Sequence, residues 1–251
     1  VFEKEARMGG VVRNVIPGFR ISDEAIDNDV KIVAAMGVEM VNGREITDIE
    51  ELKKDYDYVV LAVGASEQGI LKLETGDTMN ALDFLARFKA TDGKVELGRN
   101  VVVIGGGNTA MDTARAAKRN AGVEKVSLVY RRTRRYMPAD EEELVMAVED
   151  GVEFAELLAP VKLENGVLYC KRMVLGDIDA SGRRGVVETD QVVEVPADTV
   201  IAAVGEKVPG AFYENCGIVL DSRRRPQVNQ DTLETSVKGV YVAGDGLYGP
   251  A

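Results

Sequence analysis

One short stretch constrains the fold of this chain more than any other. The apolar run Val101–Ile104 leads directly into a glycine pattern made by Gly105, Gly107 and Ala110. A strand, a glycine turn and a helix in this order seat the pyrophosphate of a dinucleotide on the helix N-terminus, where unpaired N–H groups and the helix dipole favour negative charge. Gly105 allows the tight turn, Gly107 lets the backbone approach the phosphates, and Ala110 keeps the helix close to the strand. The stretch predicts a dinucleotide-binding α/β fold.

The next strand indicates which dinucleotide is bound. A helix over 109–119 and an apolar strand at Val126–Tyr130 complete a βαβ unit of ordinary length. In a site for NAD, this second strand usually ends in an acidic residue that binds the ribose 2′-hydroxyl. Here it ends in Arg131 and Arg132, and guanidinium groups hold a 2′-phosphate in bidentate fashion. We therefore expect a preference for NADP(H) over NAD(H).

The basic run after this strand has a second interpretation. Residues Arg131–Arg135 include four arginines, and the acidic run Asp140–Glu143 follows shortly after. The two runs would then pair on a solvated surface. This alternative applies more to Arg134 and Arg135 than to the two arginines at the strand end.

Two acidic residues at predicted strand ends indicate a second nucleotide. Glu3 ends an apolar strand, where a dinucleotide fold places the acid that binds a ribose, about 20 residues after the glycine turn. The chain begins at Val1 without methionine, so we expect it to be an internal piece of a longer protein. Gly244 and Asp245 follow a second short strand, and an Asp in such a turn accepts a hydrogen bond from a ribityl hydroxyl. The alternatives are an exposed glutamate and an ordinary turn.

Two more predicted strands end in glycine, at Leu61–Gly64 and Ala202–Gly205. The ligand crevice of a parallel sheet lies at the carboxyl ends of its strands, where glycine lets a cofactor pass close to the backbone. A plain strand-ending glycine is the alternative at either position. Further along, the runs Val152–Phe154, Val167–Val174 and Val186–Val195 predict an antiparallel meander over the parallel sheet, with turns at Asn165-Gly166 and Asp179–Gly182.

Composition narrows the chemistry. The net charge of −11 argues against nucleic acid as a partner, and no apolar run approaches the 18 residues of a membrane segment. Cys170 and Cys216 are too far apart for a redox pair or an iron–sulfur ligand set, and the chain has no histidine. Hydride transfer between two cofactors needs neither residue, because the chemistry belongs to the cofactors. We expect a cytoplasmic enzyme of this kind.

Several of these motifs occur together in one known family. The stretch Val1–Ile21, the pattern Gly105–Asp112, the arginine pair with Met137-Pro-Ala, and Gly239–Asp245 resemble the glutamate synthase small-subunit family, which includes the N-terminal part of dihydropyrimidine dehydrogenase. Residues 9–21 and 122–125 are most similar to the selenate reductase iron–sulfur subunit of that family. The resemblance extends over essentially all 251 residues.

The resemblance implies an electron-transfer module with two Rossmann-like domains. NADPH gives hydride to FAD, and electrons leave through iron–sulfur clusters in other domains or subunits. An NADPH domain over 96–205 is inserted in a truncated FAD domain of residues 1–95 and 206–251. The implied NADPH residues are Gly105, Gly107, Asn108, Thr109 and Ala110 at the pyrophosphate, Arg131 and Arg132 at the 2′-phosphate, and Ala203, Val204 and Gly205 near the crossing to the flavin. The implied FAD residues are Glu3 on the ribose, Val11 and Arg20 in the loop after it, Ile46 near the adenine, and Gly244 and Asp245 beside the ribityl phosphate.

The chain also departs from the family pattern. The first glycine turn of the FAD domain, the cysteine-rich cluster domain and the helix that follows Gly249-Pro-Ala are absent. We therefore expect weak FAD binding or none, and retained NADPH binding. The main alternative is a module that senses NADP without turnover. A dehydrogenase acting directly on a small substrate is a third, disfavoured by the lack of histidine and of a Tyr-xxx-Lys pair.

Overall fold

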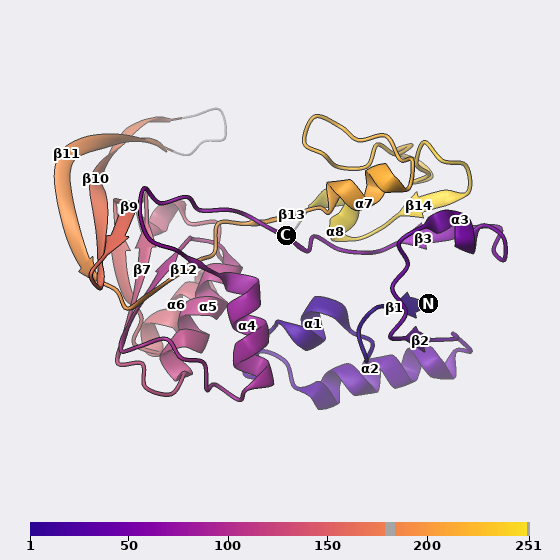
Figure 1. Cartoon of the computed structure of the whole chain (residues 1–251), viewed down its shortest axis with the longest axis horizontal. Helices are drawn as coiled ribbons and strands as arrows, with labels where there is room; N and C mark the ends of the chain where they lie inside the picture. The colour runs from indigo at the N-terminus through magenta and orange to yellow at the C-terminus, as the bar shows by residue number, and fades with distance from the viewer. Residues whose placement is uncertain (179–183, 250–251) are drawn as a thin grey trace. The chain divides into compact units, whose positions relative to one another are not determined.

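A computed structural model describes residues 1–178 and 184–249. The chain forms two compact units, each assembled from segments far apart in sequence (Figure 1). The first unit comprises Val1–Met8, Val30–Gly69 and Gly205–Ala251, and the second comprises Gly9–Asp29 and Ile70–Val204. These units are defined by compactness and not by cofactor, so the division into an FAD domain and an NADPH domain stays a prediction.

The second unit is built on a five-stranded parallel sheet. The strand order is β5-β12-β6-β7-β8, with β5 at Met79–Asn80, β6 at Asn100–Ile104, β7 at Lys125–Tyr130, β8 at Glu153–Glu156 and β12 at Thr199–Ala202. All neighbouring pairs run parallel. The two strands predicted around the glycine turn are confirmed as β6 and β7. Of these five strands, β12 comes last in the chain, yet it lies between β5 and β6 in the sheet.

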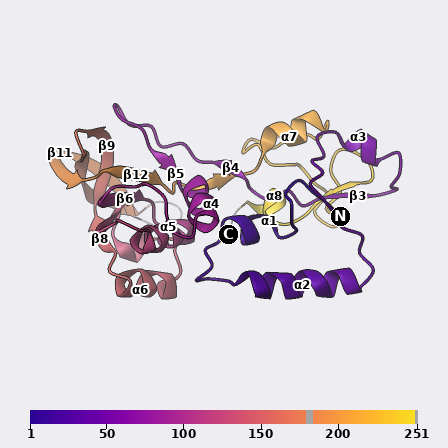
Figure 2. The same cartoon turned by 60° about the horizontal axis from the view of Figure 1, so that its bottom comes forward.

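Different layers cover the two faces of this sheet (Figure 2). Val101 and Val103 pack into the cluster formed with the helices, while Val102 and Ile104 pack into the cluster formed with the meander. A strand buried on both faces has a continuous apolar sequence, as β6 does. The helices are α4 at Ala81–Ala90, α5 at Asn108–Arg119 and α6 at Glu141–Glu149; shorter helices of this unit are α1 at Gly10–Asn14 and the 3₁₀ turn η1 at Arg134–Tyr136.

The meander consists of β9 at Leu158–Glu164, β10 at Val167–Ile178 and β11 at Arg184–Pro196, in the antiparallel order β11-β10-β9. Asn165 and Gly166 both have positive φ, 51° and 75°, as a two-residue hairpin turn requires. The predicted meander is confirmed, but the run Val152–Phe154 was assigned to it wrongly. That run belongs to β8 and pairs parallel with β7. The predicted turn at Asp179–Gly182 lies outside the described residues.

The first unit contains three two-stranded sheets. Two are parallel and the third is antiparallel: β1 at Phe2–Glu3 with β2 at Val41–Asn42, β3 at Val59–Leu61 with β14 at Val240–Val242, and β4 at Glu67–Gln68 with β13 at Glu206–Lys207. Its core packs β3 and β14 against two short helices, α3 at Ile49–Leu52 and α7 at Gly210–Asn215. α8 is at Asp245–Tyr248. The predicted helix over 23–36 is confirmed as α2 at Asp23–Ala35, within which the two units divide.

Over residues 1–178 and 184–249, the structure has no helix with the length and apolar character to cross a membrane.

Candidate dinucleotide-binding site

The glycine turn between β6 and α5 is held by close packing. Gly105 has a φ of 155°, and its N–H donates to the carbonyl oxygen of Val129 at 3.2 Å. A Cβ placed on Gly105 would lie 3.0 Å from the Ala110 Cβ and 3.1 Å from the carbonyl carbon of Ala203, and closer still to that carbonyl oxygen. The structure thus brings three predicted residues together: the turn, the helix and the end of β12 meet where only glycine fits.

The N-terminus of α5 is open to a ligand. Gly107 is the N-cap in an extended conformation, with no side-chain cap, and its carbonyl accepts from the N–H groups of Ala110 at 2.9 Å and Met111 at 3.2 Å. Within the described part of the chain, no residue accepts a hydrogen bond from the backbone N–H of Gly107, Asn108 or Thr109. A Cβ on Gly107 would meet only the Pro138 Cγ, at 4.0 Å. Free donors and free space together fit the pyrophosphate of a dinucleotide.

Sequence reasoning did not identify two residues that shape this turn, Gly106 and Tyr130. A Cβ on Gly106 would lie 2.6 Å from the ring of Tyr130, so the ring packs directly on the turn. The Tyr130 hydroxyl donates to the carbonyl oxygen of Tyr136 at 2.9 Å. Three consecutive glycines and an aromatic residue at the end of the next strand were the available signal.

The two arginines after β7 lie in different surroundings. Ile104 of β6 is in register with Val129 of β7, so Arg131 follows its strand at the same edge as the glycine turn. Arg131 is exposed, and none of the residues described forms an ion pair with it. Arg132 is half-buried, and its Nε donates to the carbonyl oxygen of Arg184 in β11 at 2.7 Å. Arg131 is therefore the more exposed of these two arginines.

Arg134 does not pair with the acidic run Asp140–Glu143, as the alternative interpretation of the basic run expected. Its guanidinium pairs with Glu156 of β8 at 2.9 Å and lies 5.2 Å from the centre of the Phe154 ring. Arg135 is exposed. The charge of Arg134 is therefore neutralised by a residue of β8 and not by the acidic run.

The remaining residues predicted near the nicotinamide follow β12. Ala203 is buried and donates its N–H to the carbonyl oxygen of Ile104 at 2.8 Å, while Val204 is 41% exposed. Gly205 has a φ of 100°, and its carbonyl oxygen accepts from the N–H of Gly69 at 2.7 Å. Ala203 is thus part of the glycine-turn contact, and the chain then passes into the first unit.

The residues predicted for FAD are divided between the units. Glu3, Ile46, Gly244 and Asp245 belong to the first unit. The Glu3 carboxylate accepts from the N–H of Glu5 at 3.0 Å, and Ile46 packs half-buried against the core. Gly244 precedes α8 with a φ of 67°, and a Cβ on it would meet nothing within 4 Å. An open positive-φ glycine beside an acidic residue fits a cofactor that approaches the backbone.

Val11 and Arg20, also predicted for FAD, lie in the second unit. Val11 is 46% exposed on α1. Arg20 pairs with Asp112 of α5 at 3.1 Å and with Glu143 of α6 at 2.5 Å. In this structure Arg20 thus joins two helices of the second unit.

The match to known families extends over almost the whole chain. Residues 9–250 match the model of the pyridine nucleotide-disulphide oxidoreductases, a range that includes both the glycine turn and the turn at Gly244. The chain belongs to this family.

Relatives agree with this assignment and with the resemblance to the glutamate synthase small chain. The chain is 42% identical over 259 residues to YgfK of Escherichia coli O157:H7, covering all of this chain and 25% of that protein. It is 33% identical to the glutamate synthase [NADPH] small chain of Azospirillum brasilense, covering 99% of this chain and 56% of the other. The chain therefore spans about a quarter to a half of the length of these relatives.

Solved structures agree on the fold. FprA of Mycobacterium tuberculosis in complex with NADPH superposes with a TM-score of 0.80 at 19% identity, covering 100% of this chain and 72% of FprA. The predicted fold class, an α/β protein of dinucleotide-binding type, is confirmed.

A partly buried ionic network joins α5 and α6. Burial raises the pKa of Asp112, and the Arg20 guanidinium offsets this only in part. Asp150, at the end of α6, accepts from the Arg115 Nε at 2.7 Å and also from Arg119. Burial opposes ionisation of Asp150, but these hydrogen bonds outweigh it and lower its pKa. The network is structural, because Asp112 and Glu143 are buried and already paired.

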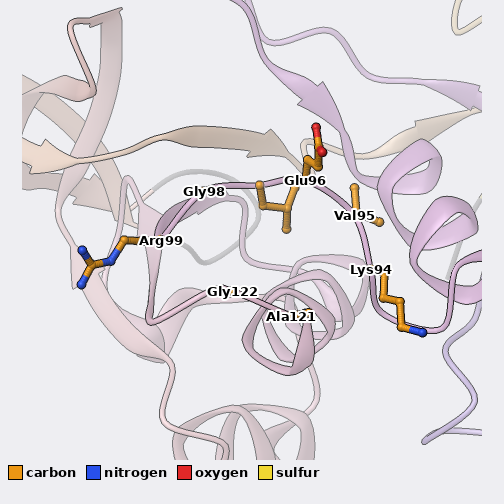
Figure 3. Close-up of a pocket in the computed structure, with 8 residues that line it drawn as sticks. Lys94, Val95, Glu96, Gly98, Arg99, Ala121 and Gly122 are labelled. Atoms are coloured by element: carbon orange, nitrogen blue, oxygen red, sulfur yellow. The ribbon is translucent and has the colours of Figure 1, made fainter.

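A shallow pocket of about 380 Å³ lies at the opposite edge of the second unit (Figure 3). It is lined by the segment 94–99, which leads into β6, and by Ala121 and Gly122, which follow α5. These segments lie at the amino ends of the strands, whereas ligands of such sheets bind at the carboxyl ends. We therefore place the candidate site at the glycine turn and not in this pocket.

The two cysteines of the chain are poorly placed for disulphide chemistry. Cys170 and Cys216 are both buried and free, and they lie in different units. Burial raises the pKa of Cys170 to about 12, which disfavours the reactive thiolate. Among the described residues there is also no group of three His, Cys, Asp or Glu side chains arranged to hold a metal.

Proposed function

We propose that this chain is the NADPH- and FAD-binding module of an electron-transfer oxidoreductase. One observation carries the proposal: the open N-terminus of α5 lies at the same sheet edge as the exposed guanidinium of Arg131. A pyrophosphate and a 2′-phosphate are parts of one NADPH molecule, and this edge offers a group suited to each. The similarity to the glutamate synthase [NADPH] small chain supports the same cofactor.

Each residue of the NADPH site has a distinct role in this proposal. The backbone N–H groups of Gly107, Asn108 and Thr109 donate to the pyrophosphate. Arg131 binds the 2′-phosphate, and Ala203–Gly205 lie along the nicotinamide half of the cofactor. Gly105 and Ala110 bind nothing themselves but keep α5 close to the sheet.

The first unit holds the flavin in this proposal. A flavin held there would supply the chemistry of accepting a hydride and releasing electrons singly. Asp245 accepts a hydrogen bond from a ribityl hydroxyl, Gly244 lets the phosphate approach the backbone, and Glu3 binds the adenosine ribose. The electrons then pass to iron–sulfur clusters and a final acceptor in other domains or subunits. The greater length of the relatives supports such additional parts.

Two measurements test the proposal. Titration calorimetry of the chain with NADP⁺ and with NAD⁺ should show tighter binding of NADP⁺. A longer chain that includes the first glycine turn of the FAD domain, incubated with FAD and freed of excess, should carry the visible flavin band, and anaerobic NADPH should bleach it faster than NADH. NADP⁺ binding with no flavin band would favour a module that senses NADP without turnover. No binding of either nucleotide at millimolar concentration would refute the proposal.

A further inference from the structure

We infer that Asn108 is a positioning residue that fixes the loop carrying Arg131 against the glycine turn and thereby sets the preference for NADPH over NADH. The loop comprises residues 131–140 and is called the arginine loop below. The inference rests on the proposed function, because it concerns how one part of the NADPH site is held. The family resemblance implies that Asn108 lies at the pyrophosphate. The inference assigns its side chain to the arginine loop instead.

Both polar atoms of the Asn108 side chain form hydrogen bonds to the end of the arginine loop. Its Nδ2 donates to the Asp140 Oδ2 at 2.9 Å, and its Oδ1 accepts from the backbone N–H of Asp140 at 2.9 Å. Asn108 is the first residue of α5 and Asp140 is the N-cap of α6. The two hydrogen bonds therefore close a ring between the starts of both helices. The backbone N–H of Asn108 and the second hydrogen on its Nδ2 are left for a phosphate.

Further contacts tie the same loop to the same turn. The N–H of Ala139 donates to the carbonyl oxygen of Gly106 at 3.1 Å. The hydroxyl of Tyr130, whose ring packs on Gly106, holds the middle of the loop through the Tyr136 carbonyl at 2.9 Å. Arg132, at the start of the loop, accepts at its carbonyl from the N–H of Leu157 at 3.2 Å. The loop is thus fixed at its start, middle and end, and Arg131 is the exposed cation at its first position.

This arrangement links two binding groups that must engage one ligand. The pyrophosphate contacts the start of α5, and the 2′-phosphate contacts Arg131. Both phosphates bind well only if the distance between these groups is held, since loosely held binding groups lose affinity when they must be ordered. NAD⁺ lacks the 2′-phosphate, so it does not depend on the arginine loop. Loosening the loop should therefore weaken the binding of NADP⁺ more than that of NAD⁺. If Asn108 instead contacted the pyrophosphate, its loss would weaken both nucleotides equally.

The experiment measures the ratio of the dissociation constants for NAD⁺ and NADP⁺ by titration calorimetry of the full chain. Asn108→Ala should lower this ratio by about tenfold, because it removes two hydrogen bonds to the loop. Asp140→Ala keeps one of the two bonds and should lower the ratio less. Asp140→Asn keeps an acceptor for the Asn108 Nδ2 and should retain the ratio. The matched control is Asn229→Ala, which removes side-chain bonds to the N–H groups of Asp231 and Thr232 in a turn of the first unit.

A double variant separates positioning from other effects. In an Arg131→Ala background, Asn108→Ala should leave the ratio unchanged, because the group that it positions is gone. Limited trypsin cleavage after the four arginines of residues 131–135 in the nucleotide-free chain provides a second readout. It should be faster in Asn108→Ala than in wild type or Asn229→Ala, with melting temperatures confirming that each variant is folded.

The outcomes distinguish this inference from the proposed function. If wild type prefers NADP⁺ and Asn108→Ala keeps that preference, the inference alone is overturned. Equal weakening of NAD⁺ and NADP⁺ by Asn108→Ala would also overturn it, since it would assign the side chain to the shared pyrophosphate. If wild type shows no preference for NADP⁺, both the proposed function and the inference fail.

Discussion

Replacing Gly105 with alanine should destabilise the chain strongly. The new Cβ would lie 3.0 Å from the Ala110 Cβ and 3.1 Å from the Ala203 carbonyl carbon, so α5 or the end of β12 must move. Overpacking of this kind costs about 1–3 kcal/mol. A φ of 155° is strained for any residue with a Cβ and adds about 1–3 kcal/mol. The free energy of unfolding should therefore fall by about 2–6 kcal/mol, a large part of the roughly 5–15 kcal/mol typical of a native protein.

The assay is thermal unfolding followed by far-ultraviolet circular dichroism. For a chain of this size, each kcal/mol lowers the melting temperature by about 2–4 °C, so Gly105→Ala should melt about 5–20 °C below wild type. Gly107→Ala is the matched control, two residues away in the same turn. Gly107 has an ordinary extended backbone and open space around its Cβ position, so its alanine variant should stay within about 1 kcal/mol of wild type.

Gly107→Ala should keep the stability of the fold but lose nucleotide affinity. Gly107→Ala places a methyl group where the proposed pyrophosphate approaches, and it should weaken NADP⁺ and NAD⁺ together by about tenfold or more, equivalent to about 1.4 kcal/mol. The reasoning is refuted if Gly105→Ala melts within about 2 °C of wild type. It is equally refuted if Gly107→Ala proves the less stable of the two.

Three further substitutions test other parts of the structure. Arg131→Ala should weaken NADP⁺ binding by about 10–100-fold, the value of a charge-assisted contact, and leave NAD⁺ within about twofold by calorimetry; equal losses would contradict its role at the 2′-phosphate. Asp150→Asn should lower the free energy of unfolding by about 1–3 kcal/mol at neutral pH, because it weakens the bonds from Arg119. Since the folded-state pKa of Asp150 is lowered, this difference should persist above the ordinary value of 3.8 and shrink as the pH falls below it in urea titrations; a constant difference would contradict the assignment. Tyr213→Phe should match or exceed wild-type stability by up to about 2 kcal/mol, because the buried hydroxyl, whose pKa burial raises to about 12, has no hydrogen-bond partner among the residues that the structure describes. A loss above about 1 kcal/mol on melting would contradict this expectation.

Local patterns predicted the fold where a segment's own sequence determines its state. The strand Val101–Ile104 was evident because β-branched residues buried on both faces leave a continuous apolar run. Partners of short strands were harder to predict. The run Val152–Phe154 was assigned to the wrong sheet, because three residues carry no information on what they pair with. β9 was not predicted; it contains Pro160, which is tolerated because β9 is an edge strand.

The candidate site was predictable to the same extent. Gly105 and Ala110 follow from the local pattern, and the structure shows the packing that requires small residues there. The different surroundings of Arg131 and Arg132 were not foreseen, because they depend on the meander carbonyl that Arg132 contacts. The pairing of Asn108 with Asp140 joins residues 32 positions apart and leaves no local signal.

The glycine turn also depends on a strand that comes much later in the chain. Ala202 of β12 is in register with Ile104 of β6, and the next residue, Ala203, supplies the carbonyl group on which Gly105 packs. β12 lies between β5 and β6 in the sheet, but in the chain it follows the whole meander. The side of β6 next to the turn is therefore covered by a strand that comes about 95 residues later in the sequence. A βαβ unit of ordinary length is therefore not sufficient to shape this turn. Because the same contact keeps α5 close to the sheet, substitutions at Ala203 that move this carbonyl should weaken nucleotide binding in calorimetry without touching a phosphate.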